Sequence, residues 1–232
     1  MQNADPREVA QFDRLASRWW DPAGEMAPLH VINAPRTAYI ERAAGGLAGK
    51  RAVDVGCGGG LLSEALARRG ARVLGVDLAG EALAVARDHA AAGGFAIEYR
   101  AIDAESLARE QPAAFDLVCC LEMLEHVPDP ASVVTACAAL AKPGGHVVFS
   151  TLNRTAKSWA LAIVAAEYAL GLVPRGTHEY ARFIRPSELE RWARAAGLQT
   201  RDVTGLRYNP LMKHARLADD ADVNYLMHCA KP

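Results

Sequence analysis

The sequence contains little cysteine, and its cysteines lack the spacing of a structural framework. They are odd in number, and none belongs to a Cys-x-x-Cys pair: Cys57, Cys119, Cys120, Cys137 and Cys229. A disulfide framework or a zinc site is therefore not expected, and the chain is expected in a reducing compartment.

An excess of positive charge and long apolar runs are also missing. The 26 Lys and Arg face 27 Asp and Glu, whereas a protein that grips a nucleic-acid backbone normally carries a basic surplus. No apolar run reaches about 18 uncharged residues, so no membrane-spanning helix is expected. The first residues lack a basic stretch followed by an apolar one, so no secretory signal is expected. These absences predict a cytoplasmic protein without a nucleic-acid partner.

The chain alternates short β-branched runs with helical stretches. Strands are expected at 51–55, 72–76, 97–100, 115–120 and 146–150, and helices at 61–69, 81–92 and 131–140. This rhythm predicts an α/β fold with right-handed crossovers and a mostly parallel sheet covered by helices on both faces. With 232 residues, 51% of them hydrophobic, the chain is expected to form one domain.

The segments that flank this alternation are expected to be helical and then mixed. Helices at 5–18 and 35–44, joined by a loop at Trp19–Pro22, would form an N-terminal helical cap over residues 1–50 ahead of a cofactor-binding half at 51–150. A helical insert or lid is expected within 155–185, with its helix at 155–173. A helix at 186–196 and strands at 198–203 and 223–229 would complete the domain.

A glycine-rich loop is the sharpest local signal. Asp54-Val-Gly-Cys-Gly-Gly-Gly60 follows the first expected strand and opens a helix, and Asp77 ends the second strand. Glycines allow backbone N–H groups to approach a ligand closely, and an acid at the end of the second strand can bind both hydroxyls of a ribose. The pattern predicts an adenosine-bearing cofactor at the carboxyl ends of the strands. The alternative is a tight turn without a ligand.

The details of the loop point to one cofactor. Leu61 stands where the dinucleotide fingerprint G-x-G-x-x-G has its third glycine, and no G-x-x-x-x-G-K-[ST] loop occurs. With Asp54 ahead of Gly56-x-Gly58-x-Gly60, the loop resembles the first motif of class I S-adenosylmethionine-dependent methyltransferases. The resemblance implies a Rossmann-like sheet with an antiparallel C-terminal strand. It also places Asp77 at the ribose, Asp103-Ala104 beside the adenine, 115–118 in the fourth strand and 142–145 before the fifth.

Further motifs resemble one family more narrowly, from about Phe12 to Lys231. They are Trp19–Pro22, Leu29-His30, Asn33, Pro35-Arg36, Tyr39-Ile40, Leu121–Pro130, Thr151–Arg154 and Gly176–Tyr180. These segments resemble the ubiquinone biosynthesis O-methyltransferases. That resemblance implies methyl transfer from S-adenosylmethionine to ring hydroxyls of 2-polyprenyl-6-hydroxyphenol and 3-demethylubiquinol, and a ubiquinone-biosynthesis complex as a partner.

The same resemblance implies that Arg36, Gly56, Asp77 and Leu121 contact the cofactor, with Arg36 reaching the methionine carboxylate. Asp54, Gly58 and Asp103 complete the predicted cofactor site. Two positions depart from the family pattern. Asn33-Ala34-Pro35 replaces an Asn-Pro pair, and Leu121 replaces a common methionine, a nearly volume-conserving change.

Glu122, Glu125 and His126 are the candidate catalytic group. If their segment is helical, their spacing puts them on one face at the end of the fourth strand. They could bind Mg²⁺, whose charge would lower the pKa of a coordinated catechol hydroxyl, or His126 or a glutamate could act directly as a general base. The family resemblance favours Mg²⁺. The alternative to both is a solvated acidic segment.

His178 and the preceding insert are further candidates. His178 lies in an expected loop and is interpreted as part of the substrate shell, or else as an ordinary loop histidine. Residues 159–173 carry one charge, Glu167, between Lys157 and Arg175. This pattern predicts a helix in the membrane interface, so that 157–175 would make a peripheral contact with the inner face of the membrane. A core or dimer helix would look similar.

Two other functions stay open on the sequence. One is methyl transfer to another small phenol or lipid, and the other is a non-catalytic S-adenosylmethionine-binding subunit, which would have no need of Glu122, Glu125 and His126. A nucleic-acid methyltransferase is disfavoured because the chain is nearly neutral and lacks an Asn/Asp-Pro-Pro-aromatic motif.

Overall fold

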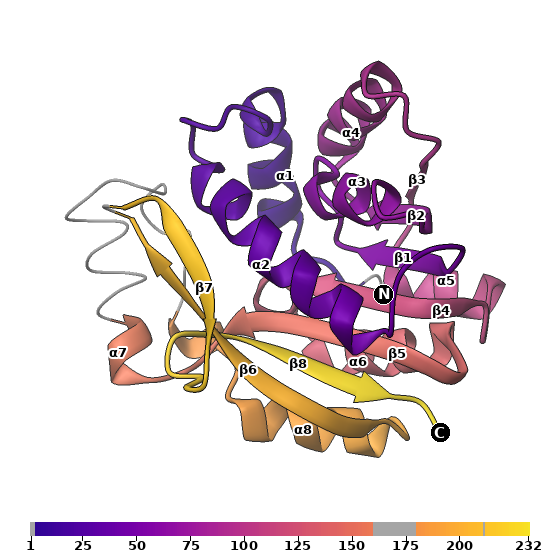
Figure 1. Ribbon diagram of the computed structural model, residues 1–232, viewed down its shortest axis with the longest axis vertical. Coiled ribbons are helices and arrows are strands. Elements are labelled where there is room, and N and C mark those ends of the chain that lie inside the picture. The colour runs from indigo at the N-terminus through magenta and orange to yellow at the C-terminus, as the bar shows by residue number, and fades with distance from the viewer. Residues whose placement is uncertain (1–2, 160–179, 211) are drawn as a thin grey trace.

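The computed structural model describes residues 3–159, 180–210 and 212–232. These residues form an eight-stranded sheet in the order β3-β2-β1-β4-β5-β8-β6-β7 (Figure 1). The strands are β1 Arg51–Val55, β2 Arg72–Asp77, β3 Glu98–Ala101, β4 Phe115–Leu121, β5 Ala141–Leu152, β6 Gln199–Asn209, β7 His214–Ala218 and β8 Asn224–Ala230. Strands β1 to β5 pair in parallel, and β5, β8, β6 and β7 pair antiparallel. The predicted α/β fold is confirmed.

Helices cover both faces of this sheet. They are α1 Pro6–Leu15, α2 Ala27–Ala43, α3 Leu61–Ala67, α4 Gly80–Ala92, α5 Ala104–Glu110, α6 Pro130–Leu140, α7 Ala156–Ser158 and α8 Pro186–Ala195, with short 3-10 turns η1 Ala16–Arg18, η2 Leu124–His126 and η4 Tyr180–Arg182. One apolar core joins the sheet to α5, α6 and α8, and another joins it to α2 and α3. In Figure 1, α1 to α4 lie together on one side of the sheet. This arrangement leaves the carboxyl ends of the parallel strands accessible to a ligand.

Several elements differ from the sequence expectation. Strand β5 begins at Ala141 rather than 146, so residues 142–145, expected to precede it, lie inside it. Helix α2 begins at Ala27 rather than 35, because Pro28 occupies its first turn and Pro35 lies inside the helix. Helix α5 was missed, although Asp103 caps it by accepting a hydrogen bond from the Ser106 N–H at 2.7 Å. Strand β7 was also missed, and it pairs with a β6 that runs to Asn209 rather than 203.

The division of the chain into a cap, a cofactor-binding half and an insert stays a prediction. Residues 160–179 of the expected insert, with His178, lie outside the described residues.

Candidate active site

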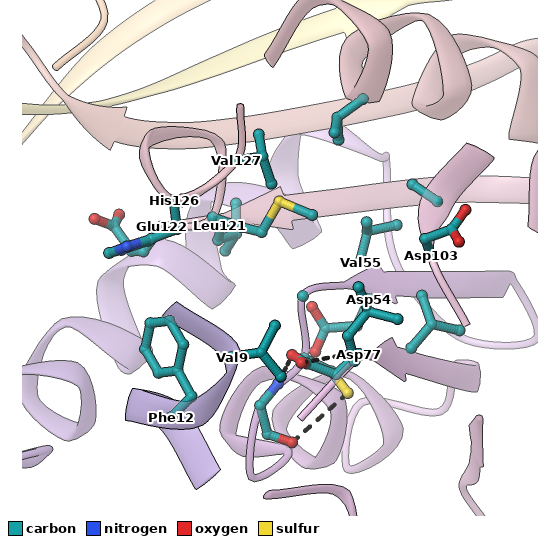
Figure 2. A pocket seen from close by; sticks show the side chains of 18 of the residues that line it. Val9, Phe12, Asp54, Val55, Asp77, Asp103, Leu121, Glu122, His126 and Val127 are labelled. Atoms are coloured by element: carbon teal, nitrogen blue, oxygen red, sulfur yellow. Dashed lines mark hydrogen bonds between the residues drawn. The ribbon is translucent and has the colours of Figure 1, made fainter. Parts of the chain in front are cut away.

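A pocket lies where β1, β2 and β4 end (Figure 2). Every residue predicted to contact the cofactor lines it: Arg36, Asp54, Gly56, Gly58, Asp77, Asp103 and Leu121. Glu122 and His126 line it as well, whereas Glu125 does not. Helix α1, which sequence reasoning had not placed at the site, adds Glu8, Val9 and Phe12. The structure thus brings the predicted cofactor residues together, and their contacts with a bound cofactor stay predictions.

The glycine loop has a shape that side chains would not tolerate. Gly58 has a φ of +50°, and a Cβ built there would lie 2.2 Å from Cζ2 of Trp19. A Cβ at Gly56 would lie 2.6 Å from Cγ of Met123. The Trp20 indole N–H donates to the Gly59 carbonyl at 2.9 Å. The Trp-Trp pair of the family motif therefore packs on the loop and holds it, which requires glycine at the points of contact.

Asp77 ties the glycine loop to β2. Its Oδ2 accepts the Gly58 N–H at 2.8 Å, and its Oδ1 accepts the N–H groups of Leu78 and Ala79 at 2.7 and 2.9 Å. Burial raises the pKa of this carboxyl, and the three hydrogen bonds act against that rise. A carboxylate has about four acceptor sites, so ribose hydroxyls can still bind. The role of Asp77 at the ribose stays a prediction, and its hydrogen bond to the glycine loop was not anticipated from the sequence.

Arg36 and Asp54 form the buried electrostatic centre of the pocket. Arg36 is 5% exposed and Asp54 2%. Burial raises the pKa of Asp54 to about 6, although the Ser63 hydroxyl donates to its Oδ2 at 2.7 Å and the charge of Arg36 lies nearby. Arg36 donates through Nε to Asn33 Oδ1 at 3.0 Å, and within the described ranges its Nη atoms make no hydrogen bond. The fork of the guanidinium is therefore available for a carboxylate.

Glu122, Glu125 and His126 are each held by a different partner. Glu122 accepts hydrogen bonds from Ser150 Oγ and Asn224 Nδ2, and Glu125 accepts one from Thr151 Oγ1 at 2.8 Å. Turn η2 contains only two of the three residues, and Glu122 precedes it with a φ of +51°. The expected face of a single helix is therefore absent.

The Mg²⁺ hypothesis is tested by this donor set. Within residues 3–159, 180–210 and 212–232, no group of three His, Cys, Asp or Glu side chains could hold a metal ion. A hard divalent cation needs several converging oxygen ligands, and these two carboxylates bind neighbouring hydroxyl and amide groups instead. The arrangement therefore does not fit Mg²⁺ at Glu122, Glu125 and His126.

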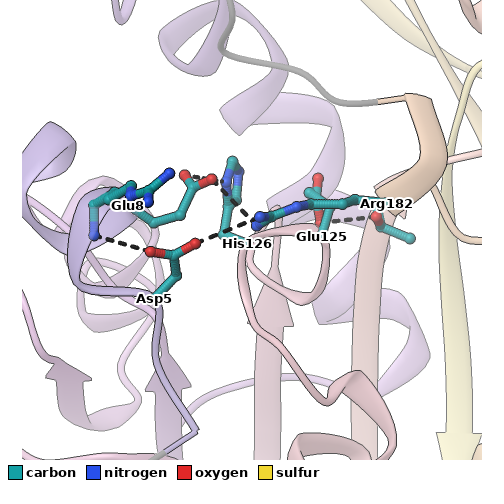
Figure 3. Close-up of polar contacts among 7 residues, drawn as sticks. Asp5, Glu8, Glu125, His126 and Arg182 are labelled. Atoms are coloured by element: carbon teal, nitrogen blue, oxygen red, sulfur yellow. Dashed lines mark hydrogen bonds and ion pairs between the residues drawn. The ribbon is translucent and has the colours of Figure 1, made fainter.

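His126 is fastened to helix α1 (Figure 3). Its Nδ1 lies 3.0 Å from Glu8 Oε2, and Arg182 approaches Asp5 and Glu8, at 3.4 Å each. The Phe12 ring packs edge-on against the imidazole, with 5.1 Å between ring centroids. Burial lowers the pKa of His126, but the Glu8 hydrogen bond and the neighbouring carboxylates outweigh it, so the pKa lies above its ordinary value. This pairing leaves Nε2 as the unprotonated nitrogen when the ring is neutral.

The stability of the fold should depend on pH through Glu125. Burial, followed by the charge of Glu122, raises the pKa of this carboxyl to about 7, whereas in an unfolded chain it ionises near about 4.3. Its contribution is fully present below pH ~4.3 and is lost as the pH rises through the folded-state value. We therefore compare the unfolding free energies of Glu125→Gln and wild type at pH 5 and at pH 8. The difference between them should shift in favour of the variant by on the order of 2 kcal/mol as the pH rises from 5 to 8. Urea unfolding at both pH values measures this, and an equal difference at both would contradict it.

Comparisons with known proteins agree with this architecture. A family model described as a methyltransferase domain matches residues 30–203. The Synechocystis magnesium protoporphyrin IX methyltransferase, solved with bound SAM, superposes with a TM-score of 0.67 at 18% identity and 100% coverage of both chains. A SAM-dependent methyltransferase from Aquifex aeolicus superposes with a TM-score of 0.62 at 13% identity, covering 97% of this chain and 98% of that one. At these identities the likeness shows the fold. The fold and the matching domain together define an S-adenosylmethionine-dependent methyltransferase.

Closer relatives narrow the class. The ubiquinone biosynthesis O-methyltransferase of Leptothrix cholodnii is 58% identical, over 100% of this chain and 99% of its own length. The protein of the same name from Pseudomonas aeruginosa (strain UCBPP-PA14) is 56% identical, over 98% of this chain and 97% of its own length. The chain therefore belongs to the ubiquinone biosynthesis O-methyltransferases.

Proposed function

We propose that the chain methylates ring hydroxyls of polyprenylated phenols, with 2-polyprenyl-6-hydroxyphenol and 3-demethylubiquinol as substrates. The observation that carries the proposal is one pocket with two different ends. In Figure 2, Asp77 lies away from Glu122 and His126, and the glycine loop is hydrogen-bonded to Asp77 through the Gly58 N–H. The names of the full-length relatives support a ubiquinone precursor as the acceptor.

Methyl transfer is an in-line displacement, and the residues of the pocket have different roles in it. S-adenosylmethionine supplies, when bound, a methyl group on a positively charged sulfur. Asp77 and the glycine loop fix the ribose, and Arg36 binds the methionine carboxylate. Val9 and Phe12 of α1 exclude water from the reacting groups.

His126 is the base in this proposal. A phenol has a pKa near 10, so at neutral pH its oxygen keeps its proton until a base takes it. As the phenol oxygen forms its bond to the methyl carbon and the carbon–sulfur bond breaks, Nε2 of His126 accepts the phenol proton. Glu8 holds Nδ1 and stabilises the imidazolium that forms.

The insert is proposed as the membrane contact at the cytoplasmic face. Residues 159–173 carry a single charge, and the described residues on either side of the undescribed segment expose aromatic rings, with Trp159 48% and Tyr180 36% exposed. Aromatic and basic residues at the ends of an apolar segment favour a position in the membrane interface. Among the described helices, none has the length and apolar character needed to cross a membrane.

One experiment tests substrate and membrane contact together. Purified protein is incubated with methyl-labelled S-adenosylmethionine and vesicles that contain a short-chain demethylubiquinol, and the vesicles are then floated. We expect label in the quinol, activity in EDTA equal to that without it, and protein in the vesicle fraction. Leu161→Glu with Ile163→Glu should remove the protein from that fraction.

Each readout can fail alone. Without label in the quinol, the substrate assignment is wrong and a non-catalytic subunit becomes the better explanation. A large loss of turnover in EDTA would restore the metal hypothesis. Equal flotation of wild type and variant would refute the membrane contact.

A further inference from the structure

Glu122 has an unusual backbone for a residue with a side chain. It follows the last residue of β4 with a φ of +51°, in the left-handed region, and its N–H donates to the Ser150 carbonyl at 2.9 Å. This conformation costs a non-glycine residue about 1 kcal/mol or more, so the surroundings must enforce it. As a result, the chain departs from the strand conformation at Glu122, and the side chain of this residue lines the pocket.

Two residues outside the pocket lining hold that carboxylate. Ser150 lies in β5, and its Oγ donates to Oε1 of Glu122. Asn224 begins β8, and its Nδ2 lies 3.1 Å from Oε1 and 3.0 Å from Oε2 of Glu122. Ser150 is fully buried. Because the two donors come from different strands and contact both carboxylate oxygens, Glu122 has little freedom to turn.

The amide of Asn224 is oriented by this contact. Its Oδ1 is buried and has no hydrogen-bond partner within the described residues, whereas its Nδ2 serves the carboxylate. A buried acceptor without a partner costs stability, so the carboxylate of Glu122 sets which way this amide faces.

We propose that Ser150 and Asn224 are positioning residues for the methyl acceptor. They fix the Glu122 carboxylate so that it accepts a hydrogen bond from the ring hydroxyl and aims the phenol oxygen at the methyl group. They touch neither substrate nor cofactor and act through Glu122. This inference rests on the proposed function, since it assigns the end of the pocket beside His126 to the phenol.

The test compares Asn224→Asp and Ser150→Ala with wild type. Asparagine to aspartate preserves shape but opposes two carboxylates, so we expect kcat for a short-chain demethylubiquinol to fall about 30-fold, and Ser150→Ala to lower it about 5-fold. The Kd for S-adenosylhomocysteine, measured by calorimetry, should stay within about twofold in both, which also shows that each variant is folded. Thr204→Val is the matched control: it removes a hydroxyl that donates to Asp202 on the same sheet, and kcat should not change.

Coupling to Glu122 separates positioning from a structural role. In a Glu122→Gln background, Asn224→Asp should lower kcat less than twofold further, because no carboxylate is left to repel. The inference fails if Asn224→Asp has the kcat of wild type, or if its effect on kcat multiplies fully with that of Glu122→Gln. It also fails if the Kd for S-adenosylhomocysteine rises as much as kcat falls, because Glu122 would then act on the methyl donor. No turnover by the wild-type chain would overturn the proposed function and this inference with it.

Discussion

Replacement of Asp77 with alanine is expected to weaken binding of S-adenosylhomocysteine by about 100-fold. Hydrogen bonds to a charged group contribute about 1.5–3 kcal/mol each, and the variant loses those proposed to the ribose. It also releases the Gly58 N–H that Asp77 accepts at 2.8 Å, so the glycine loop loses its link to β2. Calorimetry with S-adenosylhomocysteine measures the loss.

Asp116 offers a matched control for this experiment. Its carboxylate also accepts a backbone N–H, that of Arg51 at 2.8 Å, but it lies at the opposite end of the parallel strands. Asp116→Ala should leave the affinity for S-adenosylhomocysteine unchanged. Equal affinities of Asp77→Ala and wild type would remove Asp77 from the cofactor site.

Arg36→Met is expected to harm both the fold and the cofactor site. Arg36 is buried near Asp54 and Glu122, and its charge favours the ionised form of Asp54. Removal of one partner from a buried charged group costs about 3–5 kcal/mol, so the unfolding free energy should fall by about 3 kcal/mol at pH 8. Loss of the counter-charge raises the pKa of Asp54 above about 6, and protonation relieves the cost. The deficit should therefore shrink as the pH falls towards 5.

The ligand dependence of Arg36→Met identifies the group that the guanidinium binds. Affinity for S-adenosylhomocysteine should fall at least about 10-fold. Affinity for 5′-methylthioadenosine, which lacks the amino-acid carboxylate, should change less than twofold. Arg100→Met, which removes a surface pair with Glu110, is the control that should affect neither ligand. Equal losses for both ligands would mean that Arg36 acts on the shape of the pocket and not on the carboxylate.

Local chemistry explains which parts of the site could be predicted. Gly56 and Gly58 follow β1 and Asp77 ends β2, so all three belong to one strand-helix-strand unit, and their spacing predicts that they lie together. Asp103 offered the same kind of local signal, an N-cap, and the helix behind it was nevertheless overlooked.

Contacts between distant segments could not be predicted in this way. Glu122 meets Asn224 and His126 meets Glu8 across more than 100 residues of sequence. The helical spacing of Glu122, Glu125 and His126 suggested a common face, but the backbone at Glu122 is left-handed and each of the three side chains contacts a different neighbour. Tertiary hydrogen bonds therefore overruled the local pattern.

Helix α1 is attached to the site partly by charged contacts. It lines the pocket, and Glu8 of this helix contacts His126. Arg182 also forms ion pairs with Asp5 and Glu8 at 3.4 Å each, and the arginine side chain is one-third exposed. Exposed pairs of this length contribute little stability and weaken further with salt. The apolar contacts of Val9, Phe12 and Leu15 do not depend on salt in this way, so a rise in ionic strength is expected to weaken only the charged part of the attachment of α1.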